Sequence, residues 1–315
     1  MDISRCKVMV PGSSANVGSG FDVFGLAVSI YSYFSLQNNN EITYIGRDDI
    51  DKDLAKNTVF TSFSRVLKEF KQDVPKVGIW IKNHIPIKRG LGSSSVAIIG
   101  GLSLGYVYLL SRGLLTEELS NFNTFKERII LPLGVEIEGH PDNITPSVVG
   151  GFTVSGIDGS MKYYKVSVPE NLHFVFVIPE FDVSTQSARS VLPEKYERKD
   201  VISNIRSAIS LILGFINNDP DLISVGLNDR LHQPYRSNLY KGFEKLLKLS
   251  KNEVSERFIG SFVSGSGPTI CCVFYSQPSF SEIEKLRDFL KLNNLTSYDI
   301  QILSVDNYGT RLIET

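Results

Sequence analysis

The sequence has no excess of either charge. It carries 33 Lys and Arg residues against 34 Asp and Glu residues, which gives a net charge of −1. A protein that binds by neutralising many phosphates needs a clear cationic excess. We therefore predict neither a nucleic-acid partner nor an anionic membrane partner. The sequence also contains no internal repeat and no low-complexity tail, which argues against a repeat array or a disordered protein.

Cysteine is scarce. The three cysteines are Cys6, Cys271 and Cys272, an odd number that fits no metal-ligand spacing, and the adjacent pair would form a disulfide only with strain. We interpret them as buried free thiols in a reducing compartment. The first ten residues contain neither the apolar core nor the cleavage site of a signal peptide. These features together predict a cytoplasmic protein.

Charged side chains are also missing from Gly90 to Ser111, a run long enough for a transmembrane helix. Its first residues, GLGSSS, are loop formers and helix starters. The apolar part, Val96 to Leu110, would span about 22 Å as a helix, less than the roughly 30 Å of a bilayer core. We predict a helix buried on all sides in a water-soluble protein.

The 315 residues and an apolar fraction of 42% indicate two globular domains. We place the boundary near residues 156–170 and divide the chain into 1–160 and 161–315. Strands are expected at Lys7–Val10, Ala27–Gln37, Glu41–Ile45, Val77–Ile81, Phe152–Ser155, Lys162–Val168, Leu172–Ile178, Thr269–Tyr275 and Asp299–Val305. Helices are expected from Asn57, at Val201–Asn217, Leu222–Leu231 and Tyr240–Leu249, and after a Ser281/Glu284 capping box.

The clearest motif for chemistry runs directly into the buried helix. It reads Pro86, Ile87, Lys88, Arg89, Gly90, Leu91, Gly92, Ser93, Ser94, Ser95. Glycines let the backbone approach an anion, and the first helical turn offers free N–H groups and the positive end of the helix dipole. The motif is neither a Walker A loop nor a Rossmann fingerprint. Taken alone it indicates either a phosphate-binding loop or a Gly/Ser turn that only caps a core helix.

Three further segments combine small and polar residues. Residues 11–22 read PGSSANVGSGFD, residues 138–143 read EGHPDN and residues 264–269 read SGSGPT. The second segment holds an acid, a base and an amide, which suits a metal-assisted phosphoryl transfer. Each segment alone has an ordinary structural explanation, as a surface loop, a structural histidine or a tight strand entry.

The four segments, in this order, resemble the GHMP small-molecule kinases over nearly the whole chain. Within that family, the segments VSTQSAR (183–189) and HQPYR (232–236) are most similar to the branch that phosphorylates L-homoserine. The resemblance implies an α+β fold with an N-terminal domain like domain 2 of ribosomal protein S5. It implies a C-terminal ferredoxin-like domain, with the active site between the two. The first domain would carry the ATP-binding loop and the second the substrate-binding arginines.

The resemblance also implies roles for individual residues. The phosphates of ATP would lie in the loop 86–95, and its adenine near Asn57 and Val59. Magnesium would be held by Glu138 and the hydroxyl of Ser94. Homoserine would be bound by Asn16, Asp22, His140, Asn143, Arg189 and Arg236, with guanidinium forks on its carboxylate and Asp22 on its ammonium. Asp142, Asn143 and Thr185 would take part in catalysis. Whether a true base exists is open, because the proton can pass to the phosphate itself.

The sequence departs from the usual family pattern at Lys88, Ser95 and Gln233, where glycine, alanine and glutamate are common. We expect the Lys88 side chain to point to solvent. Two alternatives stay open: the same chemistry on another alcohol, such as mevalonate, shikimate or a sugar, and a non-catalytic ligand-binding or RNA-binding relative. A homodimer is expected from the family alone.

Overall fold

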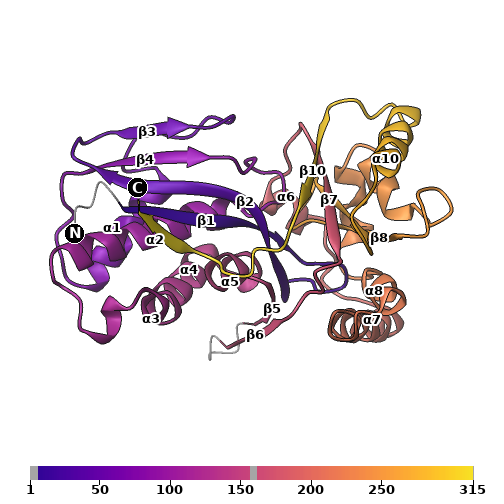
Figure 1. Ribbon diagram of the computed structural model, residues 1–315, viewed down its shortest axis with the longest axis horizontal. Helices are drawn as coiled ribbons and strands as arrows, with labels where there is room; N and C mark the ends of the chain where they lie inside the picture. The colour runs from indigo at the N-terminus through magenta and orange to yellow at the C-terminus, as the bar shows by residue number, and fades with distance from the viewer. Residues whose placement is uncertain (1–5, 157–161, 315) are drawn as a thin grey trace.

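The computed structural model describes residues 6–156 and 162–314, which form two β-sheets with helices packed around them (Figure 1). The first sheet has seven strands: β1 (Cys6–Ala15), β2 (Phe24–Gln37), β3 (Ile42–Ile45), β4 (Gly78–Asn83), β5 (Phe152–Ser155), β6 (Tyr163–Val166) and β11 (Arg311–Glu314). The second has four: β7 (His173–Pro179), β8 (Phe258–Val263), β9 (Ile270–Phe274) and β10 (Tyr298–Leu303).

The helices divide between the two sheets. The α-helices beside the first sheet are α1 (Thr58–Glu69), α2 (Ser93–Ser111), α3 (Phe122–Phe125), α4 (Leu131–Glu138) and α5 (Pro141–Val149). The second half of the chain adds α6 (Thr185–Ser190), α7 (Arg198–Asn217), α8 (Pro220–Gly226), α9 (Gln233–Arg236) and α10 (Phe280–Leu292). Short 3₁₀ segments are η2 (Glu118–Ser120), η4 (Ser237–Leu239) and η5 (Phe243–Lys248), and η3 (Lys126–Ile130) is a π-helical turn.

The first sheet has the order β11-β1-β2-β4-β3, and β5 pairs with the beginning of β2 and with β6. The asparagine turn after β2 reverses the chain, yet β3 pairs in parallel with β4 rather than with β2. Two strands from beyond residue 160, β6 and β11, complete this sheet. No single position in the chain therefore separates the strands of the first sheet from those of the second. The domain boundary near residue 160 stays a prediction.

The second sheet has the order β10-β7-β9-β8, with antiparallel neighbours throughout. The sequence predicts a βαβ-like run over the last strands and α10. In the structure β7 lies between β9 and β10, so the helix connects two strands that are parallel but not adjacent.

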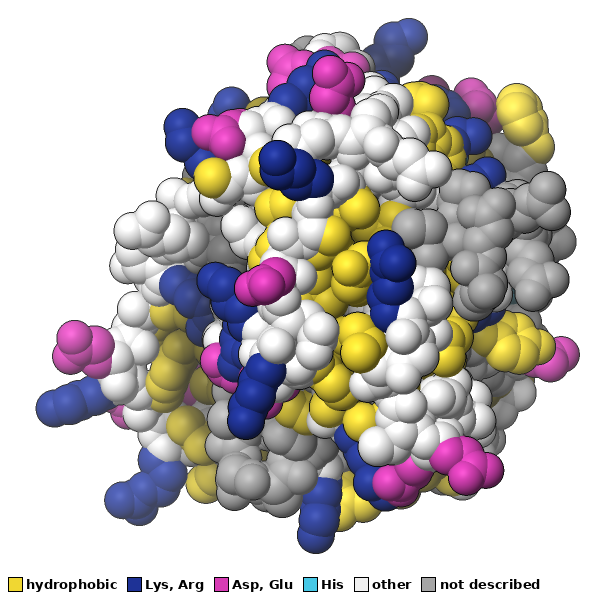
Figure 2. Space-filling model, turned by 90° about the vertical axis from the view of Figure 1, so that its left-hand side faces the viewer, with side chains coloured by type: hydrophobic (Ala, Val, Ile, Leu, Met, Phe, Trp, Pro, Cys, Tyr) yellow, Lys and Arg dark blue, Asp and Glu magenta, His cyan; other side chains and the backbone are white. Residues whose placement is uncertain are grey.

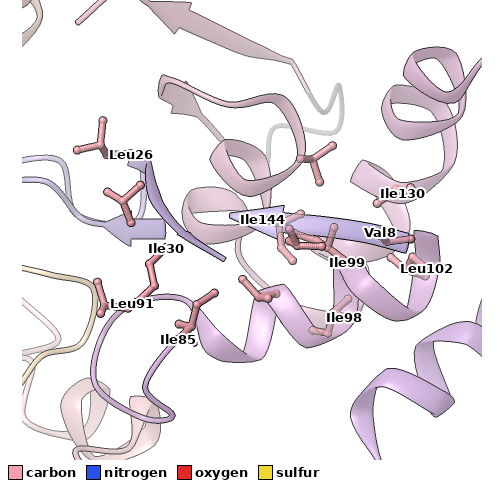
Figure 3. Packing of buried hydrophobic residues seen from close by; sticks show 14 of the residues in the cluster. Val8, Leu26, Ile30, Ile85, Leu91, Ile98, Ile99, Leu102, Ile130 and Ile144 are labelled. Carbon is pink, nitrogen blue, oxygen red and sulfur yellow. The ribbon is translucent and has the colours of Figure 1, made fainter. Parts of the chain in front are cut away.

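Helix α2 is the central element of the first half. Figure 3 shows Ile99 and Leu102 of α2 beside Val8 of β1, and all three side chains are fully buried. Among the described residues, α2 alone is long and apolar enough to cross a membrane, but 72% of its most apolar window is buried inside the protein. The prediction of a buried helix is confirmed. Because most of its surface is packed, α2 holds its N-terminus at a fixed position.

Several predicted element boundaries are wrong. The capping box of α10 is formed by Ser279 and Glu282, not by Ser281 and Glu284. Both pairs fit the Ser-x-x-Glu pattern, but Glu282 also receives hydrogen bonds from Arg257, which favours the earlier frame. The helix expected at Tyr240–Leu249 is a 3₁₀ segment that begins after Gly242, whose φ is +98°. The helix expected at Leu222–Leu231 is α8, which ends at Gly226.

All three cysteines are buried, as predicted, and Cys271 and Cys272 are free thiols. Burial raises the pKa of the Cys272 thiol to about 12, which leaves it protonated and unreactive at neutral pH. On the face of the molecule in Figure 2, the Lys and Arg side chains are scattered among Asp and Glu rather than gathered into one patch.

Candidate active site

A cavity of about 390 Å³ lies where loops from both sheets meet. Its walls come from the β1–β2 loop, the loop before α2, the α4–α5 junction, α6, α9 and the loop before β9. The predicted site residues in its lining are Asn16, Asn57, Val59, Ile87, Lys88, Gly90, Gly92, Ser93, Ser94, Glu138, His140, Asp142, Asn143, Thr185, Arg189 and Arg236. The structure thus brings together residues that are more than 200 positions apart in the chain.

The loop before α2 is shaped by its glycines. Gly90 and Gly92 have φ angles of +80° and +71°. A Cβ atom on Gly90 would lie 2.2 Å from the carbonyl oxygen of Ser264, and one on Gly92 would lie 2.2 Å from Ser13 Oγ. Gly92 is the N-cap of α2 and has no side chain to satisfy the first N–H groups of the helix. The loop therefore presents free N–H groups and the positive end of a 19-residue helix to the cavity, as an anion-binding site requires.

Two serines of the first helical turn converge on one carboxylate. Ser94 Oγ donates to Glu138 Oε2 and Ser95 Oγ donates to Glu138 Oε1, both at 3.0 Å. Glu138 is the last residue of α4, so the packing of α4 against α2 fixes this geometry. Ser95 is fully buried, so the serine found in place of the usual alanine fixes the orientation of the carboxylate.

The donors around Glu138 fit a magnesium ion. A carboxylate and a hydroxyl are hard oxygen ligands, and magnesium in proteins often takes only one or two such groups together with water and substrate phosphates. The described residues include no cluster of three or more His, Cys, Asp or Glu side chains that could hold a metal by themselves. The arrangement therefore suits an ion shared with a nucleotide phosphate.

The start of α5 holds the acid, base and amide of the EGHPDN segment. Asp142 Oδ1 lies 3.0 Å from His140 Nδ1, and only 2% of Asp142 is exposed. The hydrogen bond to Asp142 raises the pKa of His140, although burial acts in the opposite direction. Asn143 Oδ1 accepts a hydrogen bond from Ser13 Oγ at 2.9 Å, which ties α5 to the end of β1.

The β1–β2 loop joins the two halves of the site. Asn16 has a φ of +65°, its Oδ1 accepts from the backbone N–H of Asp22 at 2.9 Å, and its Nδ2 donates to the carbonyl of Gly265 at 2.8 Å. Asp22 in turn forms a two-pronged ion pair with Arg189 of α6. One N–H and the oxygen of the Asn16 amide therefore bind protein partners, which fixes the backbone of this loop.

Arg236 of α9 is a buried cation, with 1% of its surface exposed. Its Nε donates to the carbonyl of Ala188 at 3.0 Å and its Nη1 to that of Gly265 at 3.3 Å. No carboxylate of the described residues forms an ion pair with it, and burial lowers the pKa of its guanidinium. A buried charge without a counter-ion is costly, so this end of the cavity favours an anionic ligand group.

The sequence was compared with known proteins. It matches the family description "GHMP kinases N terminal domain" over residues 57–151 and "GHMP kinases C terminal" over residues 209–293. A homoserine kinase of Natranaerobius thermophilus is 35% identical over 98% of this chain and 97% of its own length. One of Aquifex aeolicus is 34% identical over 97% of this chain and 99% of its own length. This chain belongs to the homoserine kinase family of the GHMP kinases.

Structural comparison agrees with this assignment. The crystal structure of homoserine kinase from Cytophaga hutchinsonii has a TM-score of 0.80 to this structure, with 28% identity over 99% of both chains. A mevalonate kinase structure, at 15% identity and a TM-score of 0.63 over 96% of this chain and 99% of its own, shares the fold. The predicted fold class and family are confirmed.

Five residues expected at a homoserine kinase site do not line the cavity: Asp22, Pro86, Arg89, Leu91 and Ser95. Leu91 is in the hydrophobic core. Arg89 points away from the cavity and donates to the carbonyls of Ile87, Pro179 and Glu180, which ties the glycine loop to the end of β7. The side-chain amide of Asn57 is used to cap α1, where Oδ1 accepts from Val59 N and Phe60 N, so an adenine contact there would involve backbone atoms.

Two departures from the homoserine kinase pattern have structural explanations. The Lys88 side chain is 62% exposed and pairs with Asp182 at 3.8 Å, so the prediction that it points to solvent is confirmed. Gln233 is buried, and its Oε1 accepts from the backbone N–H of Val263 at 2.7 Å. Gln233 therefore anchors α9 to β8 and does not reach the cavity.

Sequence reasoning missed the apolar end of the cavity. Its side chains come from different strands and loops and include Phe34, Tyr44, Ile50 and Ile81. In the sequence, these apolar residues resemble those of any half-buried strand or loop, so no local pattern identifies them as cavity residues. Ser13 was also missed, although it lies in the small-residue segment 11–22.

Proposed function

We propose that this protein transfers the γ-phosphoryl group of ATP to the side-chain hydroxyl of L-homoserine, giving O-phospho-L-homoserine and ADP. Membership of the homoserine kinase family supports the reaction class. The observation that carries the substrate assignment is the buried Arg236, which has no counter-ion in the part of the chain that the structure describes and lines the same cavity as the glycine loop. An amino acid carries a carboxylate that can pair with this charge, whereas a neutral sugar does not. Mevalonate and shikimate also carry a carboxylate, but neither has an ammonium group for Asp22.

ATP would lie along the cavity with its phosphates at Gly90 to Ser94. The N–H groups of the first turn of α2 would bind phosphate oxygens, since Gly92 leaves them without a side-chain cap. Phe34, Ile81 and Val96 would form an apolar surface for the adenine, close to Asn57 and Val59.

Magnesium would be held by Glu138 and the Ser94 hydroxyl. When bound, it would neutralise charge on the phosphates as the phosphoryl group leaves the bridging oxygen. The protein's part is to hold the Glu138 carboxylate in one orientation, which the hydrogen bond from Ser95 does.

Homoserine would place its carboxylate on Arg236 and Arg189 and its ammonium on Asp22. Asn143 and His140 would orient the side-chain hydroxyl, and Thr185, at the exposed start of α6, would close over it. The hydroxyl oxygen attacks the γ-phosphorus, the bond to the bridging oxygen breaks, and ADP leaves with that electron pair. The hydroxyl proton passes to a phosphoryl oxygen or to the His140–Asp142 pair.

A panel of alcohols tests this proposal. ADP formation from Mg-ATP is measured with L-homoserine, L-serine, mevalonate, shikimate and galactose, and ³¹P NMR identifies the product. We expect L-homoserine to give the highest kcat/KM by at least tenfold. A higher value for mevalonate, shikimate or galactose would refute the assignment of the substrate, and no turnover with any of the alcohols would favour a non-catalytic relative.

We also propose a cytoplasmic location and a homodimer. An exposed aliphatic stripe on α7, along the lower edge of Figure 1, supports the dimer; its members are Ile202, Ile205, Ile209, Leu213 and Ile216, each 43% to 62% exposed. Their spacing is symmetric about Ile209, so two copies related by a two-fold axis would match residue for residue. Sedimentation velocity of the wild type and of Ile209→Glu tests this: a dimer that becomes a monomer supports the interface, and a wild-type monomer contradicts it.

A further inference from the structure

His232 is a fully buried histidine that none of the proposed catalytic steps uses. It is the N-cap residue of α9, and the carboxylate of Asp229 accepts hydrogen bonds from the backbone N–H groups of His232 and Gln233 at 2.8 Å and 2.7 Å. The backbone of this segment is therefore held independently of the imidazole, which leaves the ring nitrogens for another purpose.

Hydrogen-bond chemistry fixes the tautomer of His232. Nε2 lies 3.0 Å from the carbonyl oxygen of Gly18 and 3.6 Å from Asp229 Oδ2, and both oxygens can only accept. Nε2 must therefore carry the proton. Burial lowers the pKa of His232, so the ring is neutral and Nδ1 presents a lone pair.

That lone pair faces the proposed substrate-binding arginine. Nδ1 lies 3.3 Å from Arg236 Nη1, which is a donor, so the neutral histidine accepts a hydrogen bond from the guanidinium. Phe21 covers both groups: its ring stacks on the imidazole with centroids 5.4 Å apart and lies 5.1 Å from the guanidinium carbon. Among the described residues Nη2 has no hydrogen-bond partner, so it remains for a ligand.

We propose that His232 is a positioning residue for homoserine: by accepting on Nδ1 it orients the Arg236 guanidinium so that its free edge meets the substrate carboxylate. Three acceptors, the carbonyls of Ala188 and Gly265 and the imidazole of His232, hold the fork without adding a negative charge. A carboxylate in place of His232 would neutralise Arg236 and compete with the substrate. A neutral acceptor fixes the geometry and leaves the charge for the ligand.

The proton on Nε2 gives this arrangement a second consequence. Because it is donated to Gly18, the imidazole links α9 to the β1–β2 loop that carries Asp22. The two groups proposed to bind opposite ends of the amino acid are thus held at a fixed separation by one ring. This inference rests on the proposed function, since it assigns Arg236 to the homoserine carboxylate.

Two amide variants separate the two nitrogens. Asparagine places an acceptor oxygen near the position of Nδ1. Glutamine places a donor near the position of Nε2 and leaves the Arg236 guanidinium without this hydrogen-bond acceptor. We expect His232→Gln to raise KM for homoserine about ten- to hundredfold, the loss expected for one hydrogen bond to a charged group. KM for ATP and kcat should change less than threefold. His232→Asn should recover most of the homoserine affinity. If His232 had a merely structural role, the loss of activity in the two variants would parallel their loss of melting temperature, and all kinetic constants would change together. That result would overturn the proposal.

A ligand without the carboxylate gives an independent measurement. Binding of 3-aminopropan-1-ol, the decarboxylated analogue of homoserine, should be equally weak in the wild type and in His232→Gln, while homoserine binding differs. A loss of affinity for both ligands would overturn the proposal.

The tautomer can be tested without catalysis. ¹⁵N NMR of the imidazoles, with His232→Asn used to assign the signal, should show the proton on Nε2. A proton on Nδ1 would overturn the positioning role and leave the homoserine kinase proposal intact. If the proton is on Nε2 but the protein does not phosphorylate homoserine, the proposed function is refuted, and with it the role of His232 toward that substrate.

Discussion

Asp22 and Arg189 bind each other through two parallel hydrogen bonds, Arg189 Nη1 to Oδ2 at 2.9 Å and Nη2 to Oδ1 at 2.7 Å. Their side chains are 35% and 37% exposed. They are also the residues proposed to bind the ammonium and the carboxylate of the substrate. A zwitterion can exchange this one ion pair for two, and because both side chains keep about a third of their surface exposed, solvent screening limits the free energy lost when the pair opens.

Asp22→Asn tests this exchange. The variant loses the counter-charge for the ammonium, so we expect KM for homoserine to rise at least tenfold, while KM for ATP stays within twofold. Steady-state kinetics at saturating magnesium measure both. Asp221→Asn removes another exposed carboxylate paired with a cation, Lys251, outside the cavity lining, and should leave both constants unchanged. Equal effects of the two variants would contradict the assignment of Asp22.

Glu138→Ala should reduce turnover more than Asp142→Asn. The first removes a carboxylate placed to hold magnesium, and the second removes only the partner of His140. Phosphoryl transfer depends mainly on positioning and charge neutralisation, so we expect a loss of at least a hundredfold in kcat for Glu138→Ala. Turnover is compared over a range of magnesium concentrations. Turnover of Glu138→Ala near that of the wild type would refute the metal assignment.

Gly92→Ala should block nucleotide binding, because the new Cβ would lie 2.2 Å from Ser13 Oγ and 3.1 Å from Asn143 Oδ1. Gly113 offers a matched control: its φ of +66° is similar, but nothing lies within 4 Å of a Cβ there. Gly113→Ala should therefore cost only the backbone strain, about 1 kcal/mol of unfolding free energy, and leave ATP binding unchanged. Calorimetric titration with an ATP analogue and thermal unfolding measure the two effects. Equal losses of ATP affinity would show that strain alone is responsible.

The His140–Asp142 pair should make stability depend on pH in one direction. The folded pKa of His140 is raised above the unfolded value of about 6.5. The pair therefore contributes its full stability below that value and loses it as the pH rises through the folded pKa. Asp142→Asn should lower the pKa of His140 in an NMR titration. The unfolding free energies of the wild type and the variant should differ more at pH 6 than at pH 9, and the reverse order would contradict this interpretation.

Local patterns were enough to predict the parts of the fold that local forces determine. Asn57 caps α1, with Val59, Phe63 and Val66 buried on one face, as the helical spacing predicts. The glycine loop was predicted because its glycines let the backbone approach an anion and a helix follows directly. In the structure, Gly90 and Gly92 also lie too close to other chain segments for a larger residue. The order of the four motifs along the chain, which resembles that of the GHMP kinases, then predicted site residues in four separate segments.

Features that depend on distant partners could not be predicted. Arg89 is adjacent to the glycine loop in sequence, yet its direction is set by carbonyls around the end of β7, some 90 residues away. The burial of Arg236 and the tautomer of His232 follow from Ala188, Gly265 and Gly18, which no local pattern connects to them. The frame of the α10 capping box depends on Arg257 in the same way.

Strand β11 pairs with β1, so the last of the described strands completes the sheet that the first of them begins. On a ribosome, the outer edge of β1 therefore stays uncovered until residues 311–314 have been made. An N-terminal half expressed alone would keep that edge open, and such edges recruit strands from other molecules. We therefore expect the two predicted domains, 1–160 and 161–315, to depend on each other for stability.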